Sequence, residues 1–582
     1  MKRWLKAGVW SAIFTVLVAG VLWYLFLPAL NVKSVGTWMF VITILVVFGL
    51  SYEILGLCFG IGDQGKNYGY VSGRHPLKEG GSGYRFGIYV LVIAAVAGIT
   101  MTVIGFFSGT FFHAKKYANI LKVEEDCDFQ EDLVETLSTD AIAIMDTNSA
   151  RMLGNRKLGS LSSLVSQYNV SDSYSQINYQ GTPVKVATLD YAGFFKYVKN
   201  KKTGIPGYVL VSPVDMSAQY VDLEQNMKYV PSGHFSDKLI RHIRFGYPTA
   251  MIRDIWFEID EEGAPYFVAS VYDNTIGLFG GTDIVGSIVV NPVSGDMNYY
   301  KVEDVPEWVD IVYDGDLLCE QYDYYGKLRN GYWNSKFSAE GCKVTTSDYG
   351  YIAMDNDIWV YTGVTSVNSD ASNIGFMLMN ERTKESKFYT IAGADEYSAM
   401  TAAQGEVQQY GYVASFPSLI NVDGNATYIM VLKDSGGLVK MYAAVNAEQY
   451  NMVTTASDQK ECIEKYRRMM KTGDPEASVD EETGAAESVG NAENAGNATG
   501  TSNATEGTLQ PQPMIDPSLY EDKTVVVSQL KEIVVDGNTM LYLLTEDGEF
   551  YHAKYTDVLE MMKVQPGDTV DIKVYEDMFL LK

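Results

Sequence analysis

Paired carboxylates are the residues of this sequence best suited to chemistry. Two carboxyl groups held about 5–9 Å apart can cleave a glycosidic bond, one as the acid and the other as nucleophile or base. Most of the pairs here adjoin Gly or Asn in predicted turns, so turn formation is the competing explanation for them. A glycan hydrolase therefore stays open as one function. The pairs are Glu258/Asp260, Asp314/Asp316 and Asp355/Asp357.

Other catalytic patterns have little support. The five histidines form no HExxH zinc motif, and no GxSxG nucleophile elbow occurs. Residues 60–67, GIGDQGKN, satisfy GxGxxG, but an apolar segment precedes them in place of the buried strand that a phosphate-binding loop requires. We therefore predict no catalytic residue, no metal site and no cofactor.

Four of the five cysteines follow the apolar N-terminal region, and their even number is consistent with disulfides in an exported protein. We predict a bridge between Cys319 and Cys342. A second bridge between Cys127 and Cys462 would tie the two ends of the body together. Free buried thiols are the alternative, because cysteine is commonly buried without a partner.

An aromatic cluster is the candidate partner surface. Tyrosine and tryptophan offer a large rigid contact area with a polar group, which suits a protein or glycan partner. A core segment is the alternative, since only part of such a cluster is usually exposed. The cluster comprises Tyr322, Tyr324, Tyr325, Tyr332 and Trp333.

Three apolar segments, 8–30, 36–58 and 86–112, are each long enough to cross a hydrocarbon core of about 30 Å. They exclude a simple soluble protein. Glu53 is the ionisable residue well inside a span, and such a carboxylate is a functional candidate that faces a partner helix or a cavity. The alternative is that the Glu53 side chain reaches interfacial water, since Glu53 lies near the end of its span.

Charge predicts the orientation. The chain has 582 residues and a net charge of −27. Residues 1–113 hold 8 Lys and Arg against 3 Asp and Glu, and the remainder holds 37 against 69. The basic residues concentrate before the first span and in the 59–85 loop, so the positive-inside rule places the N-terminus in the cytoplasm and residues after 113 outside it. A cytoplasmic body is the alternative. The acidic body disfavours nucleic-acid binding.

The composition predicts an α+β fold in five parts. A membrane domain at 1–113 and an acidic stalk of helical appearance at 114–138 precede an α+β body at 139–471. Residues 472–518 are poor in apolar side chains and form a disordered linker. Residues 519–582 alternate apolar and polar side chains, and five strands with a helix after the third resemble a small OB-type β-barrel. This part would contact a protein or a glycan.

The body contains an internal repeat. Residues 286–300 align with 375–389 at a constant offset of 89, and 437–446 form a looser third copy. Each copy predicts a strand followed by an Asn-led turn. A helical stretch and a hairpin precede each copy, so the unit is a helix followed by an antiparallel meander. The predicted helices are 235–244, 303–313 and 394–409.

This unit resembles the PepSY domain, in which a helix packs on a sheet with a short D/N-x-x-[TS]-G turn signature. The match is carried by Val290–Asp296, VNPVSGD. Lys384 replaces the glycine in the second copy, and the third turn reads Asn446-Ala-Glu-Gln. The resemblance covers 230–455 and implies a domain that binds or restrains extracytoplasmic hydrolases without catalysis of its own.

We therefore expect a membrane-anchored extracytoplasmic binding or scaffold protein, without enzymatic activity, that positions or restrains another envelope protein. The partner could be a hydrolase, and glycan contact stays open. Two alternatives stand beside this reading. One is a glycan hydrolase that uses the clustered carboxylates. The other is an accessory subunit of a membrane transport complex, in which Glu53 joins a larger assembly.

Overall fold

The computed structural model describes residues 2–64, 82–125, 127–133, 145–367 and 372–473, and in the C-terminal region 521–535, 538–545, 547, 549–554, 564, 568–575 and 578–581. The glycine-rich loop after the second span and nearly all of the predicted linker lie outside these residues. The chain divides into two compact parts, Met1–Glu482 and Thr483–Lys582, which are described separately.

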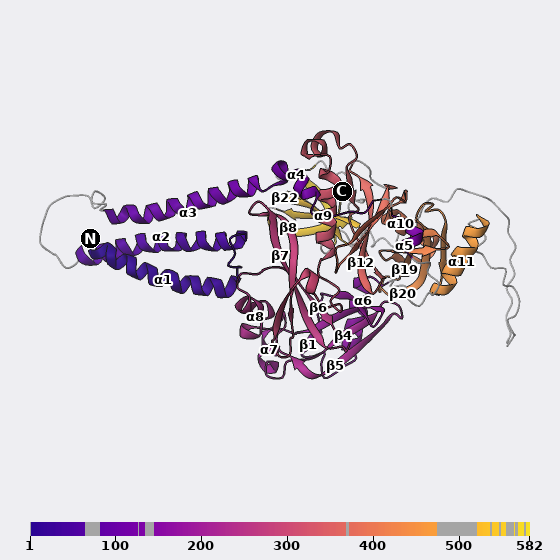
Figure 1. Ribbon diagram of the computed structural model, residues 1–582, viewed down its shortest axis with the longest axis horizontal. Coiled ribbons are helices and arrows are strands. Elements are labelled where there is room, and N and C mark those ends of the chain that lie inside the picture. Colours follow the sequence, from indigo (N-terminus) through magenta and orange to yellow (C-terminus); the bar gives the residue numbers. More distant parts are fainter. Residues whose placement is uncertain are drawn as a thin grey trace. The chain divides into compact units, whose positions relative to one another are not determined.

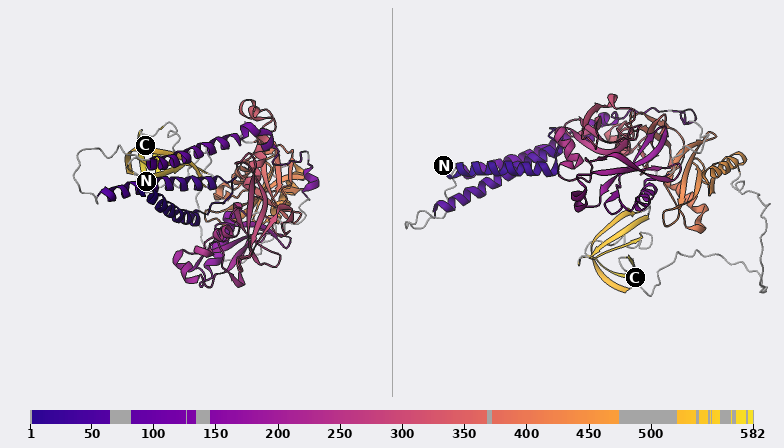
Figure 2. Two further views of the ribbon diagram at one scale, coloured as in Figure 1. Left: turned by 60° about the vertical axis from the view of Figure 1, so that its left-hand side comes forward. Right: turned by 90° about the horizontal axis from the view of Figure 1, so that it is seen from below.

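As predicted, the chain begins with three helices that are long and apolar enough to cross a membrane: α1 (Lys2–Phe26), α2 (Val35–Gln64) and α3 (Ser82–Phe107). They run side by side away from the body, and α2 packs between α1 and α3 (Figures 1 and 2). Small residues lie where the helices meet, because Gly49 faces Leu91 and Gly56 faces the Trp4 ring.

The segment after α3 is not the continuous helical stalk that its charge suggested. Helix α4 (Thr110–Ala118) ends early and α5 (Phe129–Asp132) is a single turn. Between them Glu124 pairs with the body as a strand would, donating its N–H to Ser386 and accepting from Phe388, both at 2.9 Å. Burial of Leu121 and Phe129 explains the difference, since a free stalk would leave both in water.

The body contains four successive modules, each a helix followed by an antiparallel sheet (Figure 1). In module 1 the sheet order is β1-β3-β4-β5 with β2 also on β3, and in module 2 it is β6-β7-β8-β9. Module 1 contains α6 (Thr147–Gly159), β1 (Tyr168–Val170), β2 (Ser175–Tyr179), β3 (Thr182–Tyr191), α7 (Phe194–Asn200), β4 (Ile205–Ser212) and β5 (Ser217–Met227). Module 2 contains η3 (Phe235–Asp237), α8 (Leu239–Gly246), β6 (Met251–Ile259), β7 (Pro265–Ile276), β8 (Gly280–Val290), β9 (Met297–Lys301) and η4 (Val302–Asp304).

Modules 3 and 4 follow the same plan, with sheet orders β10-β12-β14-β15 and β17-β19-β20-β21; β11 also pairs with β12, and β18 with β19. Module 3 contains α9 (Gly315–Leu328), η5 (Asn334–Ser338), β10 (Lys343–Thr345), β11 (Gly350–Met354), β12 (Asp357–Ser366), β13 (Ser372–Asn373), β14 (Gly375–Asn380), β15 (Ser386–Tyr389) and β16 (Gly393–Ala394). Module 4 contains α10 (Glu396–Glu406), η6 (Gln408–Tyr410), β17 (Val413–Ala414), β18 (Ser418–Val422), β19 (Asn425–Lys433), β20 (Val439–Asn446), β21 (Val453–Ala456) and α11 (Gln459–Thr472).

The aligned sequence segments occupy equivalent places, the third strand of the meander in modules 2, 3 and 4 (β8, β14 and β20). The asparagine after or at the end of each strand accepts the backbone N–H groups two and three residues on. These residues are Asn291, Asn380 and Asn446. Module 1 has the same plan and lies outside the range of the sequence alignment.

One predicted helix is misplaced. Residues 303–313 were expected to be helical, but η4 ends at Asp304 and α9 begins at Gly315. The start is set by Asp314, whose carboxylate accepts the N–H of Leu317 at 2.9 Å as an N-cap. Tyr322, Tyr324 and Tyr325 of the aromatic cluster are therefore on α9, whereas Tyr332 and Trp333 follow its end.

Side chains alternate between two cores along the central strands of modules 3 and 4. In β12, Val360 and Val364 pack with α9, whereas Trp359 and Tyr361 pack with α10 and β19. The same alternation in β19 sends Ile429 and Val431 toward α11. Both faces of these two sheets are therefore covered, which matches their nearly continuous apolar sequences.

The C-terminal part contains five strands: β22 (Glu521–Val535), β23 (Asn538–Thr545), β24 (Phe550–Lys554), β25 (Thr569–Tyr575) and β26 (Met578–Leu581). The pairings run β22-β23-β24-β26-β25 and return to β22, so they close in a ring. The β24–β26 contact is one parallel pair, His552 with Met578. The helix predicted after β24 lies outside the described residues.

Candidate functional site

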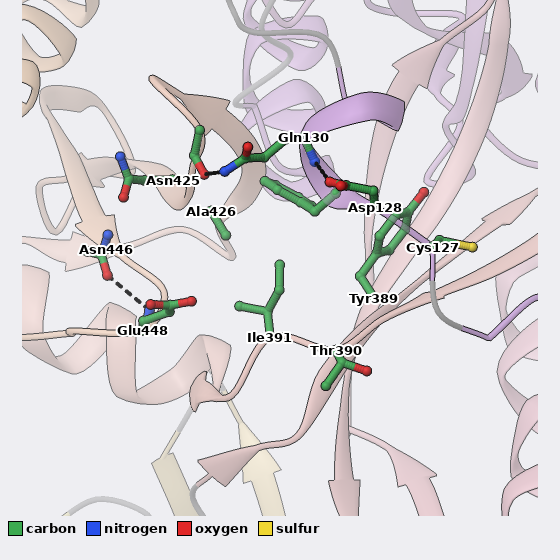
Figure 3. Close-up of a pocket in the computed structure, with 12 residues that line it drawn as sticks. Cys127, Asp128, Gln130, Tyr389, Thr390, Ile391, Asn425, Ala426, Asn446 and Glu448 are labelled. Atoms are coloured by element: carbon green, nitrogen blue, oxygen red, sulfur yellow. Dashed lines mark hydrogen bonds between the residues drawn. The ribbon is translucent and has the colours of Figure 1, made fainter.

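A pocket of about 480 Å³ opens where α5, module 3 and module 4 meet (Figure 3). Its volume is in the range of small-ligand sites. Turns and strand ends far apart in the sequence contribute to it. The lining residues are Cys127, Asp128, Phe129, Gln130, Tyr389, Thr390, Ile391, Gly424, Asn425, Ala426, Asn446 and Glu448.

Local turn chemistry positions the lining. Asp128 N-caps α5 by accepting the N–H of Gln130 at 2.8 Å. The β18–β19 hairpin turns through Asp423 and Gly424, both with positive φ, as a two-residue hairpin requires. The Gln130 side chain donates to the carbonyl of Gly424 at 3.0 Å. This bond joins α5 to the β18–β19 hairpin.

The exposed lining of the pocket is mostly polar, and its rim is acidic. Phe129, Tyr389 and Ala426 are buried, whereas the carboxylates of Asp128 and Glu448 are exposed. The lining contains no Lys, Arg or His. Such a site suits a group that carries positive charge or donates hydrogen bonds.

The thiol in the lining is not an activated nucleophile. Burial, and after it the negative charges of Asp132 and Glu124, raise the pKa of Cys127. The reactive form of cysteine is the thiolate, so this environment disfavours the reactive form. The lining therefore offers binding contacts and no nucleophile paired with a base.

The first carboxylate pair serves the fold. Glu258 is fully buried and accepts the backbone N–H groups of Asp310 at 2.9 Å and Ile311 at 3.2 Å. Burial raises the pKa of both Glu258 and Asp310, which favours their neutral forms. Asp260 accepts two N–H groups within its own turn.

The other two pairs are also engaged. Asp314 caps α9 and lies 2.6 Å from the Arg253 guanidinium. Asp357 is buried and accepts two hydrogen bonds from Arg382, at 2.7 and 2.8 Å. Each of the three pairs thus has at least one carboxylate in a structural contact.

The predicted partner surface divides between core and periphery. Tyr322 is fully buried in the core beside α9, so the core alternative holds for this residue. The hydroxyls of Tyr324 and Tyr325 donate to Glu320 and Glu125, at 2.7 and 2.8 Å.

Only the end of the cluster is strongly exposed. Trp333 is 61% exposed and stacks on Phe337. Tyr332 and Trp333 both contact Phe111, which follows the third span by four residues. These two residues are therefore at the boundary between α4 and the body.

The predicted Cys319–Cys342 disulfide is not formed, and the five cysteines are free thiols. The Cys342 thiol lies 3.5 Å from the carbonyl of Lys327, at the end of α9. Cys319 is eight residues earlier on the same helix, about 12 Å along its axis. A disulfide needs Cα atoms within about 7 Å, so the helix holds the thiols apart. The Cys127–Cys462 bridge is likewise not formed.

Glu53 lies between two spans. Its carboxyl group packs against Gly87 of α3, where a Cβ would come within 2.7 Å of the Glu53 Cδ. The contact places this side chain against the neighbouring helix of its own chain.

Sequence reasoning did not identify the pocket, because three separate turns build it. The available signals were the Asp423-Gly424 turn and the Asn446 turn, which were recognised as turns and not as one site. Among the residues that the structure describes, no group of three or more His, Cys, Asp or Glu side chains is arranged to hold a metal ion. No family model and no curated protein matches this chain.

Proposed function

We propose that this chain is a membrane-anchored binding or scaffold protein that holds another envelope protein through the pocket between modules 3 and 4. The observation that carries the proposal is the pocket itself, whose lining is mostly polar, contains no basic side chain and carries the exposed carboxylates of Asp128 and Glu448 on its rim. The partner would insert a basic or hydrogen-bond-donating segment. Charge complementarity of this kind favours encounter and orientation.

The same proposal places the N-terminus in the cytoplasm and the body outside it. The support is the positive-inside bias together with three spans, an odd number. The proposal also includes the resemblance of modules 2 to 4 to PepSY domains and that of the C-terminal strands to an OB-type barrel. They assign the modules to restraint of the partner and the C-terminal part to a further contact.

Photocrosslinking in intact membranes tests the proposal. A photoreactive amino acid at Thr390, on the pocket rim, is expected to capture one polypeptide partner. The same group at Asn155, an exposed position of α6, is the control. Capture of no protein at Thr390, or of the same proteins at both positions, would refute the proposal.

Charge reversal sharpens the test. Glu448→Lys is expected to lower the crosslinking yield at Thr390 several-fold, because the rim loses its attraction for a basic segment. Glu464→Lys is the matched control, an exposed acid on α11 in the same module. Equal loss in both variants would show that only the overall charge of the body matters.

A further inference from the structure

The face formed by α7 is apolar and basic in an otherwise acidic body. Residues 194–202 read FFKYVKNKK and hold four lysines and no acidic residue. Phe194, Phe195 and Val198 are exposed, Phe195 to 85%, whereas Tyr197 is buried. Val198 is four residues after Phe194 and three after Phe195, and residues at these spacings are neighbours on a helix, so the three exposed apolar side chains form one outward face.

This face is not covered by the body. The Phe194 ring lies beside those of His234 and Phe235, 5.2 and 6.3 Å between centroids, and Phe235 is itself exposed. The four lysines form no ion pair with any residue in the described part of the chain. They are Lys196, Lys199, Lys201 and Lys202.

The neighbouring helix α8 is bonded to the end of the first membrane span. Arg241 lies over the Tyr24 ring, 4.0 Å from its centroid, and donates to the Tyr24 carbonyl at 3.3 and 3.4 Å. The Phe245 ring contacts Trp23, 5.0 Å between centroids. Because α1 ends at Phe26, these contacts place α8 at the level where the span leaves the membrane (Figure 1).

The same network reaches α7. Arg241 also donates to the carbonyl of Phe235. The buried hydroxyl of Tyr197 in α7 donates to the carbonyl of His234, at 2.8 Å, and to Asp237, at 2.9 Å. Helix α7 is thus held in place beside α8, near the body end of α1 (Figure 1).

We propose that the α7 face is a second membrane attachment, which inserts Phe194, Phe195 and Val198 into the interface of a bilayer and binds anionic lipid headgroups through its four lysines. Aromatic rings favour the headgroup level of a membrane, and lysines extend their charged ends toward the phosphates while their stems stay apolar. The attachment would fix the body against the membrane at a point away from its covalent connections to the spans.

Lipid photocrosslinking of the full chain in vesicles tests this assignment. A photoreactive phenylalanine analogue at Phe195 is expected to form lipid adducts in vesicles of three parts phosphatidylcholine to one part phosphatidylglycerol. Tyr450 is the control, an aromatic residue 55% exposed in module 4, whose β20 and α11 lie far from the spans. Equal adduct yields at the two positions would overturn the proposal.

Two further arms test the role of charge. Changing all four lysines to Gln is expected to lower the lipid adduct yield at Phe195 at least about fivefold, the factor expected for the loss of a single lysine near an anionic surface. Vesicles of phosphatidylcholine alone should lower the yield similarly. Yields unchanged by both would overturn the assignment of the lysines to headgroups. Capture of a polypeptide at Phe195 in native membranes, in place of lipid, would overturn the membrane assignment.

Discussion

The ammonium group of Lys33 lies 2.6 Å from a carboxylate oxygen of Asp273 and so bonds the α1–α2 connection to β7 of the body. Two further hydrogen bonds join the same segments. Lys33 also donates to the carbonyl of Asn274 at 2.8 Å, and the Asn274 side chain donates back to the carbonyl of Lys33 at 2.9 Å. The body is therefore joined to the spans by contacts between segments 240 residues apart.

Lys33→Met tests this joint. The methionine keeps the apolar stem and removes the charge, so hydrogen exchange in residues 273–281 is expected to accelerate about fivefold. The factor is modest because both partners are about one-third exposed, and such pairs contribute up to about 1 kcal/mol. Lys301→Met is the control, since its pair with Glu303 is 3.8 Å long and largely exposed. Equal exchange rates in the two variants would contradict a stabilising role of the Lys33–Asp273 contact.

Gly87→Ala is expected to disturb the packing of α2 on α3. A Cβ at this position meets the Glu53 carboxyl group, and overpacking of this kind costs about 1–3 kcal/mol. Gly98→Ala on the same helix is the control, because nothing lies within 4 Å of its Cβ. The measurement is the thermal unfolding midpoint of the full chain in detergent.

A second variant identifies the cause of the Gly87→Ala effect. Shortening the neighbouring side chain in the double variant Glu53→Ala/Gly87→Ala should restore the unfolding midpoint toward that of Glu53→Ala alone. If the alanine at 87 remains as harmful in this background, the contact with Glu53 is not what excludes it.

Glu396 makes stability depend on pH. It is fully buried at the start of α10 and accepts the N–H of Gly363 at 2.6 Å. Burial raises its pKa from 4.5 to about 7. The contribution of protonated Glu396 to the free energy of unfolding is complete below about pH 4.5. It is lost as the pH rises to about 7, because this carboxyl group ionises at lower pH in the unfolded chain than in the folded one. The loss amounts to about 3 kcal/mol.

Glu396→Gln should therefore leave stability nearly unchanged at pH 4.5 and raise it at pH 8. The amide resembles the protonated acid and carries no charge to desolvate. Thermal unfolding at the two pH values measures the difference, and Glu406→Gln, an exposed acid on the same helix, is the control. A Glu396→Gln variant that gains no stability between pH 4.5 and 8 relative to the unaltered chain would refute the assignment.

Two neighbouring tyrosines of α9 have different environments that their sequence does not distinguish. Tyr322 and Tyr325 are on α9 only three residues apart, yet the first is enclosed by the cores of two sheets and the second reaches Glu125 and Arg329. The sequence left a partner surface and a core segment open for both residues. Which side of α9 is covered depends on sheets formed by residues far away in the chain.

Module 1 contains a weaker copy of the repeated turn sequence. Residues 209–214, VLVSPV, resemble the VVNPV of 289–293, and Ser212 takes the place of Asn291 by accepting the N–H of Asp215 at 3.1 Å. The offset of 79 instead of 89, together with a serine in the turn, conceals the similarity. A search that allowed different spacings would have found it.

Three apolar helices long enough to cross a membrane, the α+β class and the Asn-led turns of modules 2 to 4 could all be predicted from the residues alone. These features depend on apolar length, period-two alternation and local side-chain hydrogen bonds, all of which act over a few residues. The tertiary structure was needed to show that each carboxylate pair has at least one member in a structural contact, that the cysteines are free thiols, and that the segment around Glu124 lies along a sheet. It also decided that three separate turns enclose a pocket. Each of these outcomes depends on which distant segments pack together, and packing compares the burial of whole surfaces rather than the preferences of single residues.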